Sequence, residues 1–445
     1  MAMLPPWPRR SAFLAVLGST LLACGDPETQ PTDPTGPELT SGSVTVILQR
    51  RGDGDDADGV TVSLWSGSLV AAKPARLGDT ISFGQVPTGA YTVSVAGLDP
   101  LCRGDVADVI AVAAESNVLR LQTECAGRLL YEKEFSETRV AVLYVGADSR
   151  LRTLPLQGRQ HVRGTSPDGE RALVEEWEPA SCGVRIRTAV VTLEGGVVPL
   201  QQNPRRPVSA GARWSPAGGL IAGREEGVSS CGDGDERAIV LYEPATGAMV
   251  RTVAEGVVQV LGPDVAWSPD GVRLTYVSGN VILAYDVVTG SLTQLYSAAA
   301  SERPRDLAWA STGRYLLFRP ALGARLRVLD VSDGSVREID VAGAGSAAWH
   351  PSANLLALHA TDPARVLVVD VPNNTVTPAA ADPVPDAAHP SWNAEGDRLL
   401  VSGRSPSGAR ALYVVDWPGR EVWRVLEGDA GGPMRARWTR GTSAR

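Results

Sequence analysis

One short phrase recurs seven times in this chain and limits what the chain can fold into. Three copies read Thr165-Ser-Pro-Asp-Gly, Trp214-Ser-Pro-Ala-Gly and Trp267-Ser-Pro-Asp-Gly. The copies lie 40 to 53 residues apart, a spacing typical of repeat architectures. Each copy is followed by short β-rich runs, and the repeats show no helical periodicity. The residues that open the copies, here called the anchors, are Thr165, Trp214, Trp267, Trp309, Trp349, Trp392 and Trp438.

Four short strands per repeat predict an all-β fold whose main domain, residues 127–445, is a β-propeller. Trp438 lies too close to the end of the chain to begin a complete repeat. Three strand-like runs precede the first anchor, however, and begin at Arg128, Arg139 and Leu151. We therefore expect a composite blade that joins the two ends of the domain, since closure removes exposed strand edges. This gives seven blades; six is the alternative, because the first two repeats are stretched.

The recurring residues are expected to be structural. A large aromatic side chain at a strand end in nearly every repeat is typical of packing between neighbouring blades. The Pro-Asp-Gly that follows favours a turn, in which Asp168 and Asp270 bond back to the backbone. His350 occupies the serine position of one such turn and is therefore expected at the surface.

Residues 42–126 have the alternation of a small β-sandwich, for example in Ser43-Val-Thr-Val-Ile-Leu48. The phrase Val86-Pro-Thr-Gly-Ala-Tyr91-Thr-Val resembles the turn and strand of carboxypeptidase-regulatory-like and prealbumin-like sandwich domains. That resemblance implies a spacer or an adhesion module.

Residues 1–23 have the pattern of an export signal. Arg9 and Arg10 precede a 13-residue apolar stretch, which is short for a membrane span. The stretch ends in Leu21-Leu-Ala-Cys24, which resembles the lipobox of bacterial lipoproteins. The resemblance implies lipidation of Cys24 and, because Gly25 follows it, the outer membrane. Residues 24–41 are rich in Pro, Thr and Asp and are expected to be a flexible tether.

Four further cysteines in an exported chain indicate disulfides, with three possible connectivities. The domain boundaries favour the pairs Cys102–Cys125 and Cys182–Cys231. No cysteine or histidine spacing is typical of a metal site, so no metal or cofactor is expected. The acidic run Asp53–Gly59 lacks the ligand pattern of a calcium loop and is interpreted as a solvated loop.

The Trp-Ser-Pro-Asp-Gly phrase, followed by strands that end in Asp and a Gly turn, resembles TolB-like and WD-repeat-related propellers over roughly 320 residues. The net charge of −8 disfavours a nucleic-acid partner. No G-x-S-x-G, P-loop or H-E-x-x-H motif occurs, so no catalytic residue is nominated.

The predicted function is an envelope-anchored, non-catalytic scaffold that binds a protein or glycan partner. Insertions around Cys182 and Cys231 are expected to form an interaction surface on one face. One alternative is an exported hydrolase or lyase with a site at the channel mouth. The other is a carbohydrate-binding or sensor module.

Overall fold

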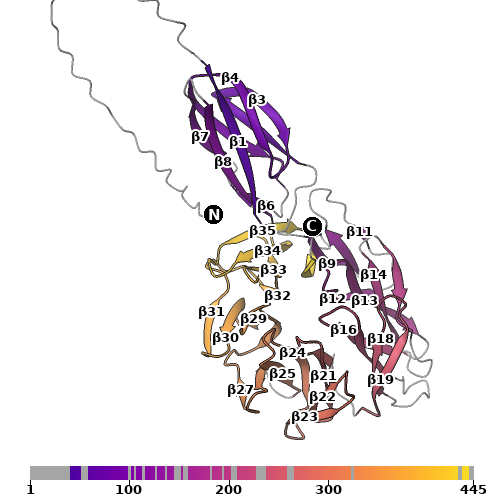
Figure 1. The fold of residues 1–445 in the computed structure, drawn as a ribbon. Coiled ribbons are helices and arrows are strands. Elements are labelled where there is room, and N and C mark those ends of the chain that lie inside the picture. Colours follow the sequence, from indigo (N-terminus) through magenta and orange to yellow (C-terminus); the bar gives the residue numbers. More distant parts are fainter. Residues whose placement is uncertain are drawn as a thin grey trace, which may run out of the picture. The chain divides into compact units, whose positions relative to one another are not determined.

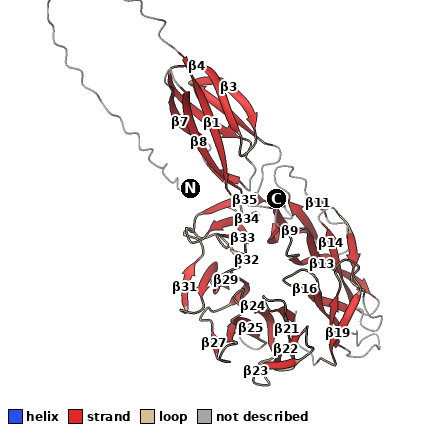
Figure 2. Ribbon diagram, in the orientation of Figure 1, coloured by secondary structure: helices blue, strands red, loops and turns tan. Residues whose placement is uncertain are grey.

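All regular elements in the described part of the chain are β-strands (Figure 2). The structure, a computed structural model, describes residues 41–51, 59–98, 102–104, 107–112, 116–125, 128–135, 138–144, 152–153, 159–180, 183–192, 195–201, 208–226, 237–257, 265–321, 325–428 and 433–439. The all-β prediction is therefore confirmed. These residues contain no helix of the length and apolar character needed to cross a membrane.

Two four-stranded sheets come first in the chain. In one, the parallel pair of β1 and β8 lies between two antiparallel edge strands, whereas the other is antiparallel throughout. The first has the order β4 (Thr80–Pro87), β1 (Ser41–Arg51), β8 (Ser116–Cys125), β6 (Cys102–Gly104). The second has the order β3 (Ser68–Ala75), β2 (Val60–Ser66), β5 (Gly89–Ala96), β7 (Ala107–Val112).

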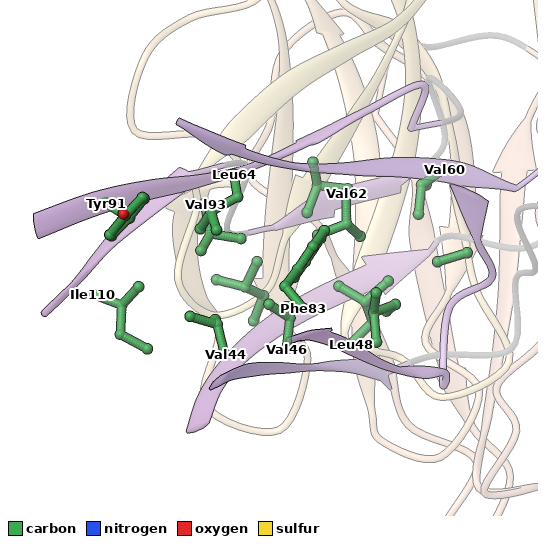
Figure 3. Packing of buried hydrophobic residues seen from close by; sticks show 14 of the residues in the cluster. Val44, Val46, Leu48, Val60, Val62, Leu64, Phe83, Tyr91, Val93 and Ile110 are labelled. Carbon is green, nitrogen blue, oxygen red and sulfur yellow. The ribbon is translucent and has the colours of Figure 1, made fainter. Parts of the chain in front are cut away.

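The two sheets share one hydrophobic core, to which alternate residues of each strand contribute (Figure 3). Val44, Val46 and Leu48 of β1 meet Val62 and Leu64 of β2, and all five side chains are at most 1% exposed. Successive side chains of a strand point to opposite faces, so a strand with one buried face has this pattern. Burial of each such side chain contributes about 1.5–3 kcal/mol.

Seven further four-stranded antiparallel sheets follow (Figure 1). Six of them are built from four consecutive strands. Their strands are β12 (Arg159–Thr165), β13 (Arg171–Ala180), β14 (Gly183–Thr192), β15 (Val197–Pro199); β16 (Val208–Trp214), β17 (Ile221–Glu226), β18 (Arg237–Tyr242), β19 (Met249–Glu255); β20 (Val265–Trp267), β21 (Arg273–Ser278), β22 (Val281–Asp286), β23 (Leu292–Ser297); β24 (Pro304–Trp309), β25 (Tyr315–Pro320), β26 (Arg327–Asp330), β27 (Val336–Glu338); β28 (Ala344–Trp349), β29 (Leu355–Thr361), β30 (Ala364–Asp370), β31 (Thr375–Pro378); and β32 (Ala388–Trp392), β33 (Arg398–Arg404), β34 (Arg410–Asp416), β35 (Val422–Glu427).

The remaining sheet combines strands from both ends of this region. Its order is β11 (Arg152–Thr153), β10 (Thr138–Tyr144), β9 (Arg128–Phe135), β36 (Pro433–Thr439). Trp438 of β36 lies opposite Leu129 of β9 in an antiparallel register. The C-terminal strand therefore completes a sheet that begins more than 300 residues earlier in the chain.

Each of the seven sheets packs against the next, and the order closes on itself. Leu129 belongs to a core shared with β33 and β34, whereas the adjacent Leu130 belongs to a core shared with β12 to β14. Neighbouring residues of a strand face opposite sides, so both sides of the sheet are buried. The same holds for Leu173 and Val174, and for Leu316 and Leu317. This explains the continuous apolar runs of the second strands, because a strand buried on both faces has no polar alternation.

Candidate functional site

The first strands of the sheets lie against one another. β12 contacts β16, β16 contacts β20, β20 contacts β24, β28 contacts β32, and β36 contacts both β32 and β12. These seven strands (β12, β16, β20, β24, β28, β32 and β36) are called the inner strands below. They carry all seven anchors, each at or next to the last residue of its strand.

The anchors join neighbouring sheets through hydrogen bonds of their indole N–H groups. Trp309 Nε1 donates to Thr275 Oγ1 at 3.0 Å, and that hydroxyl donates to the carbonyl of Ala266 at 2.7 Å. The other four bonds run directly to a backbone carbonyl just before the preceding anchor: Trp267 to Arg213 (3.3 Å), Trp349 to Ala308 (3.0 Å), Trp392 to Ala348 (3.2 Å) and Trp438 to Ser391 (3.0 Å).

The pattern of anchor hydrogen bonds differs at the first repeat, whose anchor is Thr165 instead of tryptophan. Thr165 Oγ1 donates to the Trp438 carbonyl at 3.4 Å. The indole nitrogen of Trp214 is buried and has no hydrogen-bond partner among the described residues. The Arg171 guanidinium lies 5.0 Å from the centre of that ring, within the range of a cation–π contact. The anchors thus connect sheets, and their rings contribute to the cores between them.

In five repeats the residue after the anchor caps the following turn with its side chain: Ser166, Ser215, Ser268, His350 and Asn393. Ser268 Oγ accepts the N–H of Arg273 at 2.9 Å and donates to Asp270, whose carboxylate accepts the N–H of Val272 at 3.0 Å. These bonds lower the pKa of Asp270, although burial acts in the opposite direction. Ser166 and Asp168 make the same bonds. Both aspartates are therefore engaged in turns.

The surface position expected for His350 is wrong, because its side chain is 8% exposed. Its Nδ1 accepts the N–H groups of Ser352 (3.2 Å) and Ala353 (3.0 Å), and Nε2 lies 2.9 Å from the carbonyl oxygen of Gly396. The ring is therefore neutral, with its proton on Nε2 directed to Gly396. An imidazole ring is larger than a serine side chain. To cap its turn as serine does in other repeats, the ring of His350 lies between its own turn and the turn that contains Gly396.

His350 should make stability depend on pH. Burial lowers its pKa below the ordinary 6.5, and the bond to Gly396 only partly opposes this. A folded-state pKa below the unfolded one gives stability that is present above pH 6.5 and is lost as the pH falls through the folded value. In denaturant unfolding, the stability difference between the wild type and His350→Asn is expected to shrink between pH 7.5 and 5, by at most about 1.4 kcal/mol per pH unit. A constant difference would contradict this role.

Register shifts occur in the inner strands, next to the anchors. They interrupt β12, β16, β24, β28, β32 and β36. Within four of these shifts a residue has positive φ: Gly211 (69°), Asp306 (56°), His389 (53°) and Arg435 (37°). A bulge redirects side chains, and a non-glycine residue in this region costs about 1–3 kcal/mol. The inner strands therefore contain backbone strain close to charged residues such as Asp306 and Arg437.

A buried carboxylate, Glu175 of β13, connects the first inner strands. Its side chain is fully buried, and one oxygen accepts a bond from Arg163 of β12 at 2.5 Å. The other oxygen accepts the N–H of Gly211, in the β16 bulge, at 2.7 Å. Trp177 Nε1 lies 3.3 Å from the first oxygen. Both oxygens are therefore occupied, and the carboxylate holds the β12 and β16 inner strands together.

Arg213 of β16 is a strongly perturbed charged group. Burial lowers its pKa to about 10, and the cations of Arg437 and Arg163 lower the pKa in the same direction, whereas Glu175 and Asp306 oppose the change. These groups come from β36, β12, β13 and β24, which belong with β16 to four different sheets. Charged groups of four sheets therefore act on one guanidinium.

A second ion pair at the inner strands contains Asp306, the other carboxylate that acts on Arg213. Asp306, in the β24 bulge, lies 3.3 Å from Nε of Arg319. The two terminal nitrogens of Arg319 donate to the carbonyls of Ala344 and Gly345 on β28, each at 2.6 Å. Asp306 and Arg319 therefore tie two neighbouring sheets, as Glu175 does elsewhere in the cycle.

The arginines of this site were not predicted from the sequence. A signal was present, because the residue before the anchor is Ala or Ser in four repeats but Arg at positions 213 and 437.

The cysteines of the predicted pair Cys102 and Cys125 lie opposite each other in the register of β6 and β8. Cys24, Cys182, Cys231 and the acidic run at 53–58 lie outside the described residues. Within the described ranges, no group of three His, Cys, Asp or Glu side chains has the geometry of a metal site.

Seven four-stranded sheets, each buried on both faces and arranged in a cycle around inner strands, are the arrangement of one known fold. This part of the chain is a β-propeller. The predicted propeller is thus confirmed, and TolB-like and WD40 propellers are among the similar structures.

The propeller is similar to solved structures at low sequence identity. TolB from Acinetobacter baumannii is 16% identical, over 72% of this chain and 82% of its own, with a TM-score of 0.40. The propeller domain of Cps50 (Swd1) from Myceliophteria thermophila is 15% identical, over 60% and 86%, with a TM-score of 0.43. A puromycin hydrolase S511A mutant is 16% identical, over 69% of this chain but 53% of its own, with a TM-score of 0.50. Likeness at this identity concerns the fold alone. The chain matches no protein-family model and no curated protein.

Proposed function

We propose that this protein is a binding scaffold of the cell envelope and that its propeller holds a ligand or a partner at the middle of the ring. One observation carries the proposal: Glu175 of β13 binds both Arg163 of β12 and the backbone of β16 beside Arg213, and charged groups of β24 and β36 also act on Arg213, so four different sheets contribute. Converging polar groups from several rigid elements are typical of a binding site. Strain in the inner strands supports it, because strained backbone gathers at functional sites.

We propose binding without catalysis as the primary activity. Glu175 accepts hydrogen bonds at both oxygens, and Asp306 is paired with Arg319. A carboxylate occupied in this way is not free to take a proton from a substrate. An exported hydrolase or lyase remains the alternative, and turnover in a screen of esters and polysaccharides would favour it.

The seven sheets are, in this proposal, the seven blades of a closed propeller, and the β1–β8 region is a sandwich that serves as a spacer. Support comes from the cyclic order of the cores and from the single core that the first two sheets share. The Val86–Val93 phrase, which suggested a carboxypeptidase-regulatory-like domain, lies in β4 and β5.

The envelope location and the disulfides complete the proposal. Lipidation at Cys24 and attachment to the outer membrane rest on the lipobox resemblance. A Cys102–Cys125 disulfide is supported by the register and by the oxidised state of Cys102. Cys182–Cys231 rests on the sequence argument. Mass spectrometry of the exported protein without reducing agent tests all three assignments, and an unlipidated Cys24 or free thiols would contradict them.

Photo-crosslinking in the native envelope tests the scaffold function. A photoreactive residue placed at Arg435, in the β36 bulge, is expected to capture a product that the same residue at Arg325 does not capture. Arg325 is a matched control, because it is an exposed arginine that pairs with Glu338 in the β26–β27 region. The same products at both positions, or none at Arg435, would contradict a macromolecular partner at the inner strands.

A further inference from the structure

We infer that the group bound at the inner strands is an oxyanion, the carboxylate or phosphate group of a small molecule or an acidic peptide. The inference rests on the proposed function and specifies its ligand. The cluster that carries it, the inner arginine cluster, consists of Arg163, Arg213 and Arg437. Arg163 is linked through Glu175 to the β16 bulge beside Arg213, and β12 also contacts β36, which carries Arg437.

The cluster brings like charges together beside two carboxylates that are already engaged by other groups. The cations of Arg437 and Arg163 both act unfavourably on the charge of Arg213. Glu175 is the fully buried carboxylate beside them, but Arg163, Gly211 and Trp177 occupy its oxygens. Asp306 is shared with Arg319. Even without Arg437, the three guanidinium groups of Arg163, Arg213 and Arg319 outnumber the carboxylates of Glu175 and Asp306, so the local charge is positive in a chain whose net charge is −8.

Arg213 has hydrogen-bonding capacity to spare. Among the described residues its guanidinium donates to the carbonyl of Ala212 at 3.0 Å and forms no ion pair. The Nε of Arg163 is buried without a hydrogen-bond partner in the same part of the chain. A guanidinium presents a planar fork of donors that matches the two oxygens of a carboxylate or phosphate. An incoming oxyanion would satisfy these donors and reduce the repulsion at once.

The backbone around Arg213 is held before a ligand arrives. Its carbonyl accepts the indole N–H of Trp267, and the N–H of Gly211 two residues earlier is bound by Glu175. Arg437 precedes an anchor in the same way, and the Trp438 indole is bound to Ser391 of β32. Groups fixed on rigid strands lose little freedom on binding, which favours affinity. Local positive charge would also attract anions from solution.

Anion titration of the purified exported protein tests the inference. Inorganic phosphate, citrate and a hexaglutamate peptide are added separately at low ionic strength, with sodium chloride of equal ionic strength as the reference. At least one oxyanion is expected to raise the melting temperature in a saturable way, since a ligand that binds the folded state stabilises it. The three arms separate phosphate, small carboxylate and acidic peptide as the source of the group.

Variants connect the effect to the cluster. Arg213→Gln is expected to weaken oxyanion binding at least tenfold and to leave the melting temperature without ligand unchanged or higher, because one repelling charge is gone. If Arg213 instead stabilised the fold, Arg213→Gln would lower the melting temperature without ligand. Arg213→Lys keeps the charge but loses the fork, and is expected to bind with intermediate affinity. Arg325→Gln, which removes an exposed arginine elsewhere, should bind within twofold of the wild type.

The inference falls if no oxyanion stabilises the wild type, or if Arg213→Gln binds as tightly as the wild type. If Arg213→Gln does not fold, Arg213→Lys and Arg437→Gln decide in the same way. Capture of a partner at Arg435 without any oxyanion binding would overturn this inference and keep the scaffold. Oxyanion binding without capture would support this inference and contradict a macromolecular partner.

Discussion

Deleting Arg435 to Arg445 is expected to lower the melting temperature strongly or to cause aggregation. The deletion removes most of the described part of β36, the strand through which the composite sheet meets β32 and β33. Ala436 is 4% exposed, and Trp438 packs on the core that contains Leu129 and Leu400. Trp438 is partly buried, and truncation of a fully buried aromatic costs about 3–5 kcal/mol. Its loss together with the strand pairing of β36 therefore removes a large part of a total stability of about 5–15 kcal/mol.

Loss of the strand also exposes an edge. The backbone of β9 pairs with β36 from Lys133 to Arg128, and those groups would face solvent in the truncated protein. An unpaired edge is a template for association with other chains. Thermal unfolding and light scattering measure both effects. Deletion of residues 442–445, which leaves β36 whole, is the control and should change little. Equal melting temperatures for the eleven-residue deletion and the wild type would show that β36 does not contribute to stability.

Gly247→Ala is expected to destabilise the protein by about 3 kcal/mol or more. Gly247 lies in the turn between β18 and β19 with a φ of 68°, and its N–H donates to the carbonyl of Glu243. A β-carbon there would overlap the carbonyl oxygen of Pro199, at the end of β15 in the neighbouring sheet. Because that oxygen belongs to the backbone, relief requires two sheets to move apart.

Gly334→Ala provides the matched control. Gly334 occupies the corresponding turn between β26 and β27, with a φ of 74° and the same bond to the residue four positions earlier, Asp330. No heavy atom of the described residues lies within 4 Å of the place that the new β-carbon would take. The control therefore measures the cost of positive φ alone, about 1–2 kcal/mol. Denaturant unfolding of both variants gives the difference, and equal losses would show that contact with Pro199 does not matter.

Much of the fold could be predicted because its causes are local and repeated. The anchor phrase marks the end of an inner strand in each sheet, and the Pro-Asp-Gly turns form where proline fixes φ and glycine adopts a positive φ. The composite sheet was also predictable, since strand-like runs before Thr165 had no partners and Trp438 had no repeat of its own. Strand and turn propensities and the alternation within a strand depend on residues that are close together in the chain, so they can be recognised in a single sequence.

The candidate site was less predictable. Arg213 and Arg437 occupy the position before the anchor, where four other repeats have Ala or Ser. The sequence thus shows that these two residues are exceptional, but it does not show that they lie close together. The surface position predicted for His350 followed from the likeness of its turn to the serine turns, and the sequence did not show that Gly396 leaves room for the ring.

The sequence by itself determined the all-β class, the repeat and the strand-ending turns, because each depends on a few consecutive residues. Only the tertiary structure decided which charges meet. Arg213 and Arg437 are 224 positions apart, and closure of the ring, through the pairing of β36 with β9, brings them within electrostatic range. Electrostatic energy depends on distance in space and on the surrounding dielectric, and neither can be obtained from separation along the chain.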